Sequence, residues 1–151
     1  MSLSLSEINT RCLSFNIHHY PFYQELKEYF RVLYLSGCRS SEPLLIDRWR
    51  WVSGYTLHLL PLKGNNVRTI TLDSTCDNFL NSVKLQHKPF YGRTLKQIDT
   101  VYNQLRTWHE IYVDSKPISM YMFRYRFVKD LYAKGLNDSE VAQIMGYTNS
   151  V

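Results

Sequence analysis

The chain of 151 residues is long enough for one domain with a hydrophobic core and short for two. Hydrophobic residues make up 44% and charged residues 21%, a balance that argues against disorder and is typical of a globular domain. The net charge of +5 favours polyanionic partners, because cations that neutralise phosphates release counterions from a nucleic acid.

The first part of the chain is predicted to be helical. Residues 4–7 fit a capping box, with a hydroxyl at the cap and a carboxylate three residues on, so a short helix should follow. Pro21 suits the first turn of a second helix, and Gly37 suits its end. Its apolar face, at helical spacing, consists of Phe22, Leu26, Phe30, Leu33 and Tyr34. The stretch 40–46 can add another turn or two of helix, with Pro43 in its first turn.

A small antiparallel sheet is predicted near residues 49–72. The stretch 55–59 alternates apolar with polar residues, and the stretch 67–72 is rich in β-branched residues. Between them, residues 63–66 have the composition of a turn. The two stretches therefore form a β-hairpin, with Lys63 at its turn.

The helical period returns in the second half of the chain. It predicts helices over 78–85, 94–113 and 119–134, the last with a core face of Met120, Phe123, Phe127 and Leu131. Gly135 should end that helix, and Asn137 should cap a final short helix that runs to Met145. The predicted fold class is α+β and mainly helical, a single domain with a small antiparallel β-sheet.

Cysteines, histidines and carboxylates exclude several kinds of site. The three cysteines leave one without a partner in any disulfide scheme, which favours a reducing, cytoplasmic setting. The histidines lack metal-binding spacing and no tight acidic pair is present, so we predict neither a metal nor another cofactor. Without a signal peptide or an apolar run of spanning length, we also predict no membrane partner.

Three basic residues are candidates for binding a phosphate. Arg39 follows Gly37 at a helix boundary, Lys63 lies at the hairpin turn, and Arg124 lies on the last long helix. Each has a simpler interpretation, because arginines at helix ends are usually solvated, lysines are common in turns, and Arg124 can snorkel beside an aromatic face. Their order along the chain is more specific than any one of them.

The segments around these residues resemble the motifs of the tyrosine recombinases, or phage integrase family. Residues 36–42 (SGCRSSE) are similar to the first box, Thr-Gly-x-Arg-x-x-Glu, and residues 63–68 (KGNNVR) to the hairpin motif Lys-x-x-x-x-Arg. Residues 121–125 (YMFRY) resemble the second box, His-x-x-Arg-His, and residues 145–149 (MGYTN) the third, Leu-Gly-His, with tyrosine in place of each histidine. The resemblance extends over nearly the whole chain from Leu5 onward.

The resemblance implies a reaction in which a tyrosine hydroxyl attacks a DNA phosphodiester. Arg39 and Arg124 would bind the non-bridging oxygens, on which charge builds in the transition state, and Arg68 would join them in DNA binding. Lys63 would protonate the departing sugar oxygen. The implied partner is duplex DNA, and the full-length protein would assemble with itself on DNA to integrate or excise a mobile element.

Tyr121 and Tyr147 take two of the motif's histidine positions and are predicted to be site residues. Their hydroxyls can hydrogen-bond a phosphate oxygen, but they carry no positive charge near neutrality. Tyr121 is three residues before Arg124, so the two can face the same phosphate from one helix. Phosphate binding is expected to survive these replacements, whereas proton transfer near neutral pH is expected to be weaker.

The family's attacking tyrosine follows the third box by a helical turn or two, and the given sequence stops at Val151. Tyr147 aligns with the histidine, so we predict no nucleophile in this chain. Two interpretations stay open. The preferred one is a catalytic domain truncated at its C-terminus, without the N-terminal DNA-clasping domain and inactive by itself. The other is a degenerate protein that binds DNA without cutting it.

A rival hypothesis concerns residues 136–147, which also resemble the first helix and turn of a helix-turn-helix regulator. That hypothesis predicts a recognition helix after Gly146. It gives no reason for the match at residues 36–42 or for Lys63. A plain structural helix explains the same stretch without any DNA contact.

Overall fold

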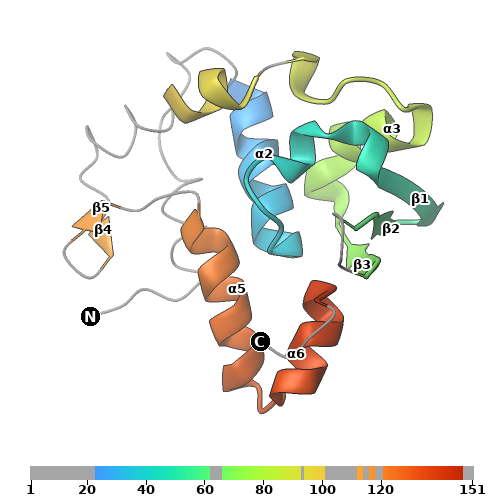
Figure 1. Cartoon of the computed structure of the whole chain (residues 1–151). Helices are drawn as coiled ribbons and strands as arrows, with labels where there is room; N and C mark the ends of the chain where they lie inside the picture. The colour runs from blue at the N-terminus through green and yellow to red at the C-terminus, as the bar shows by residue number, and fades with distance from the viewer. Residues whose placement is uncertain are drawn as a thin grey trace.

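In the computed structural model, helices α5 and α6 lie below α2 and the three-stranded sheet in the view of Figure 1. The structure describes residues 23–61, 66–92, 94–100, 112–113, 116–117 and 121–147. The chain is mainly helical with a three-stranded antiparallel sheet, which confirms the predicted fold class. The helix expected after residues 4–7 lies outside the described residues. None of the described helices is both long and apolar enough to span a membrane.

Helix α2 (Tyr23–Ser36) is the predicted amphipathic helix. Its residues Phe30 and Leu33 are buried in the core, as its apolar spacing predicts. It ends at Gly37, whose φ of +64° is a conformation that favours glycine. A Cβ on Gly37 would lie 2.4 Å from the ring of Phe127 on α5, so glycine also lets the two helices come together.

The chain then makes two short 3-10 turns before it enters the sheet. These turns, η1 (Glu42–Leu44) and η2 (Ile46–Arg48), take the place of the turn or two of helix expected over 40–46. Pro43 lies in the first turn, where its missing N–H breaks no hydrogen bond.

Three strands follow in the order β1 (Trp49–Ser53), β2 (Thr56–Leu59) and β3 (Arg68–Thr71), each antiparallel to the next. Leu57 pairs with Ile70 and both are buried, so the predicted hairpin is confirmed. Strand β1 was not foreseen as a separate element. Only Trp49 of this strand is buried, so the strand lacks the alternation that identifies a half-buried strand.

Helix α3 (Asp77–Leu85) matches the helix predicted over 78–85. The next predicted helix, 94–113, is right at its beginning and wrong at its end. Residues 95–100 are helical, and Thr94 caps them, because its hydroxyl accepts the Gln97 N–H at 3.2 Å. Residues 101–111 are outside the described part. Tyr112–Val113 form strand β4, paired with β5 (Lys116–Pro117), because strand pairing satisfies these β-prone residues.

The last two helices follow the sequence closely. Helix α5 (Tyr121–Ala133) buries Phe123 and Leu131 on its predicted core face, while Met120 is outside the described residues. Helix α6 (Asp138–Met145) begins with the predicted cap, in which Asn137 accepts the Glu140 N–H at 2.9 Å and Glu140 accepts the Asn137 N–H at 3.0 Å.

Aromatic side chains hold these elements together. Phe30 of α2 stacks on Phe123 of α5, with ring centroids 5.8 Å apart. Trp49 of β1 meets Phe79 of α3 edge-on at 5.0 Å. These contacts join α2 to α5 and β1 to α3, and all four rings belong to one hydrophobic core.

Replacing Gly37 with alanine should destabilise the fold by two separate effects. The left-handed conformation costs about 1 kcal/mol for alanine, and displacing the ring of Phe127 costs about 2 kcal/mol more. Gly135→Ala is the matched control, because Gly135 also has a positive φ, of +91°, but has nothing within 4 Å of an added Cβ. Urea unfolding measures both variants. Equal losses of unfolding free energy would mean that α2 and α5 do not meet as closely as described.

Candidate functional site

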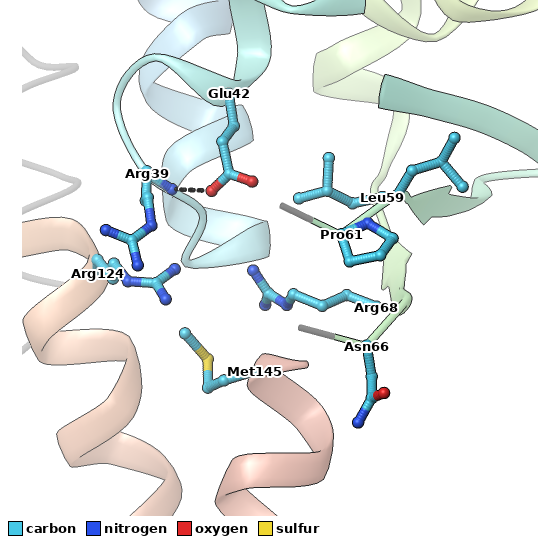
Figure 2. Close-up of a pocket in the computed structure, with 9 residues that line it drawn as sticks. Arg39, Glu42, Leu59, Pro61, Asn66, Arg68, Arg124 and Met145 are labelled. Carbon is cyan, nitrogen blue, oxygen red and sulfur yellow. Dashed lines mark hydrogen bonds between the residues drawn. The ribbon is translucent and has the colours of Figure 1, made fainter. Parts of the chain in front are cut away.

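A small pocket that opens to solvent lies where the loop after α2, the hairpin, α5 and α6 meet (Figure 2). Its lining includes Arg39, Glu42, Pro61, Asn66, Arg68, Arg124 and Met145. Three guanidinium groups thus come from three separate segments, and Glu42 is the single carboxylate among the lining residues. The pocket is suited to an anion with several oxygen atoms, since each guanidinium presents a planar set of donors.

Arg39 is positioned by the turn that follows α2. Its N–H donates to Oε1 of Glu42 at 2.7 Å, which closes the turn on itself. Glu42 is buried, and its carbonyl accepts the indole N–H of Trp49 at 2.8 Å. The carboxylate in the predicted Arg-x-x-Glu pattern therefore fixes the backbone of Arg39 and links it to β1.

Arg124 reaches the pocket from α5 and is only 7% exposed. Its Nη1 donates to the carbonyl of Gly37 at 3.0 Å, and its Nη2 donates to the hydroxyl of Tyr147 at 2.7 Å. The guanidinium carbon also lies 5.6 Å from the centroid of the Tyr147 ring. A hydroxyl that accepts from a cation directs its own proton elsewhere, so Tyr147 can still donate to a bound oxygen.

Arg68, at the beginning of β3, is also buried. Its Nε donates to the carbonyl of Ile144 at 3.0 Å, and its Nη2 donates to the carbonyl of Ser36. Burial lowers the pKa of Arg68, and the neighbouring charge of Arg124 lowers it further. The pocket therefore concentrates positive charge that the protein itself neutralises only in part.

Two of the three basic residues predicted to converge, Arg39 and Arg124, line the same pocket. Lys63 lies outside the described residues. Pro61 and Asn66, the nearest described residues before and after it in the sequence, both line the pocket. The backbone of Tyr121 lies at the start of α5, one turn before Arg124, and its side chain is outside the described part.

Sequence reasoning missed the main-chain groups of the site. The Asn66 N–H donates to the carbonyl of Gly146 at 2.5 Å, which joins the hairpin to the end of α6. A Cβ on Gly146 would lie 2.5 Å from the carbonyl oxygen of Asn66. A glycine after the last helix was the available signal, but glycine is common there for conformational reasons alone.

Neither the thiol beside the pocket nor a metal-binding cluster adds a reactive group to the site. Burial raises the pKa of the Cys38 thiol to about 12, so this neighbour of Arg39 stays protonated near neutral pH. Within the part of the chain that the structure describes, no group of three or more His, Cys, Asp or Glu side chains could hold a metal ion.

The whole arrangement is similar to solved structures of DNA recombinases. The Tn1549 transposon integrase in complex with circular intermediate DNA matches with a TM-score of 0.61 and 16% identity, over 99% of this chain and 59% of that one. XerA recombinase matches with a TM-score of 0.61 and 16% identity, over 99% of this chain and 57% of that one. This chain has the fold of a tyrosine recombinase catalytic domain.

The recombinase fold is recognised by its structure rather than by overall sequence similarity. A further structure of the same integrase, in complex with transposon right end DNA, matches at 17% identity with a TM-score of 0.60, over 99% of this chain and 58% of that one. Neither a protein-family model nor a curated protein matches the sequence. The chain spans less than two thirds of the length of the solved chains that it matches.

The bond between Tyr147 and Arg124 gives a test of the site's geometry. Tyr147→Phe keeps the ring and removes the acceptor, so it should lower the free energy of unfolding by about 1–2 kcal/mol, as expected for a hydrogen bond to a charged group. Tyr132→Phe is the control, because the hydroxyl of Tyr132 bonds Asp138 at an exposed position and its loss should cost less than about 0.5 kcal/mol. Chemical denaturation compares them. Losses of the same size would argue against a partly buried bond at Arg124.

Proposed function

We propose that the pocket binds a phosphate of duplex DNA, and that the chain is part of the catalytic domain of a site-specific recombinase or integrase. The convergence of Arg39 and Arg124, which lie far apart in the sequence, on one pocket carries this proposal. The neighbours with the same fold support it, because the Tn1549 integrase is solved in complex with DNA. The mobile-element role and a cytoplasmic location belong to the same proposal.

The chemistry proposed for the whole protein is strand cleavage and rejoining through a phosphotyrosine intermediate. Attack on the phosphorus adds charge to the non-bridging oxygens, and the guanidinium groups of Arg39 and Arg124 would hold those oxygens by hydrogen bonds of fixed geometry. Lys63, which the sequence predicts at the hairpin turn, would give a proton to the departing sugar oxygen. The nucleophilic tyrosine would come from a segment beyond the third motif.

Tyr121 and Tyr147 would assist the arginines as neutral hydrogen-bond donors. The contact between the hydroxyl of Tyr147 and Arg124, at 2.7 Å, supports this role for Tyr147. A phenol gives up its proton less readily than the imidazolium of the family's histidine would. We therefore propose tight holding of the phosphate with slow proton transfer, and self-assembly on DNA in the complete protein.

The contacts of α6 favour the recombinase over a helix-turn-helix regulator. Val141 and Met145 are buried against α5, and the carbonyls of Ile144 and Gly146 are occupied by Arg68 and Asn66. The end of α6 therefore holds two residues of the pocket wall, Arg68 and Asn66, in place. In a helix-turn-helix it would instead lead to a helix that reads the major groove.

Binding to a short fluorescent DNA duplex tests the phosphate site. Arg39→Gln and Arg124→Gln should each weaken binding about tenfold and reduce the slope of log affinity against log salt by about one. Arg31→Gln is the control, because Arg31 pairs with Asp73 at 2.8 Å and does not line the pocket, yet its loss changes the net charge equally. Fluorescence anisotropy provides the affinities. Equal weakening by all three changes would show that net charge alone attracts DNA.

Cleavage is tested on the chain together with any natural sequence that follows residue 151. A nicked suicide substrate, whose released strand diffuses away, should trap a covalent protein–DNA adduct visible on a denaturing gel. Arg124→Gln should abolish that adduct. Duplex binding without any adduct in the unmodified protein would instead support a degenerate protein that binds DNA and does not cut it.

A further inference from the structure

Arg68 bridges the ends of two helices. Its Nη2 donates to the carbonyl of Ser36, the last residue of α2, and its Nε donates to the carbonyl of Ile144 in the last turn of α6. The last carbonyls of a helix have no partner within the helix and carry the negative end of its dipole. The guanidinium therefore matches both helix ends in geometry and in charge.

The same end of α2 also receives Arg124. The carbonyl of Gly37, next to that of Ser36, accepts from Nη1 of Arg124 at 3.0 Å. Two adjacent carbonyls are thus held by arginines from two different elements, and Arg39 lies two residues after Gly37. The two bonds therefore hold the chain close to the place where Arg39 enters the pocket wall.

The surroundings of Arg68 fit its side chain closely. A Cβ on Gly146 would lie 2.7 Å from Cγ of Arg68, so only glycine lets the end of α6 approach it. The ring of Phe127 lies 6.0 Å from the guanidinium carbon, at the outer limit of a cation–π contact. Arg68 is consequently 6% exposed, although it belongs to the wall of the pocket.

The charge of Arg68 is incompletely balanced. Its Nη1 is buried and has no hydrogen-bond partner among the described residues. Figure 2 shows the side chain pointing from the hairpin toward Arg124, across the pocket from Glu42. A buried cation beside a second cation is unfavourable unless negative charge comes near, and an anion in the pocket would supply it.

We propose that Arg68 is a positioning residue of the phosphate site. It joins the ends of α2 and α6, so that Arg39, Arg124 and Tyr147 face one anion, and its buried charge strengthens the attraction for that anion. This inference rests on the proposed function, since it takes the anion to be a phosphate of the DNA backbone.

Phosphate titrations of Arg68→Lys and Arg68→Met test the proposal, at a temperature where circular dichroism shows every variant folded. Lysine keeps the charge, but a single ammonium cannot reproduce the fork that holds two carbonyls. Affinity for inorganic phosphate should fall about threefold in Arg68→Lys and about thirtyfold in Arg68→Met. Arg31→Met, which removes the same charge away from the pocket, should bind as the unmodified protein does. A parallel titration with a short duplex should give tighter binding than free phosphate, and the reverse order would assign the pocket to a free anion.

Two outcomes would overturn the proposal. Unchanged phosphate affinity in Arg68→Met, together with a lower melting temperature, would show that Arg68 only stabilises the packing of α2 and α6. Equal phosphate affinities in Arg68→Lys and Arg68→Met would show that the charge of Arg68 does not contribute to anion binding.

A measurement on the unmodified protein avoids any folding defect of the variants. Side-chain ¹⁵N resonances of Arg39, Arg68 and Arg124 should shift together and saturate at the same phosphate concentration. Shifts at Arg39 and Arg124 without one at Arg68 would overturn this inference and leave the proposed function standing. No shift at any of the three, with phosphate or with duplex, would overturn both.

Discussion

The end of helix α2 is the point on which the site depends. The carbonyls of Ser36 and Gly37 are neighbours in the chain, and each accepts a hydrogen bond from a different buried arginine, Arg68 or Arg124. Helix ends offer unpaired carbonyls with partial negative charge, so they can stabilise cations that have no carboxylate partner. Because the bonds join α2 to β3 and to α5, they gather segments that are distant in sequence. Arg39 lies two residues after Gly37, in the turn that its own N–H closes on Glu42.

Glycine makes these close approaches possible at two places. Gly37 ends α2 in a left-handed conformation and leaves room for the ring of Phe127. Gly146 does the same at the end of α6, where the hairpin and the stem of Arg68 lie against it. Both positions are where family motifs place a glycine by resemblance. In this structure the reason is steric, because a side chain at either place would push an arginine-bearing element away from the pocket.

Tyrosine at the motif's histidine positions affects phosphate binding and proton transfer differently. Holding a phosphate requires donors of fixed geometry, and the bond between Arg124 and Tyr147 shows that a phenol can form part of such a group. Moving a proton near neutral pH requires a group that titrates there, and a phenol does not. Under the proposed function, this composition would give phosphate binding with slow proton transfer, as in a slow enzyme or in a protein that binds DNA without cutting it.

The sequence by itself determined most of the element types, the glycine that ends α2, the cap of α6 and the candidate arginines, because helical spacing, capping residues and motif order are local signals. The predicted start of α2 at Pro21 lies outside the described residues. The sequence placed the sheet over residues 49–72 but did not single out strand β1, whose exposed residues do not alternate with buried ones, and it extended a helix into β4, where strand pairing overrides helical spacing. Only the tertiary structure decided that Arg68 is buried and bonded to the carbonyls of Ser36 and Ile144. Every residue has such a carbonyl, so no letter in the sequence marks the ones that an arginine will reach.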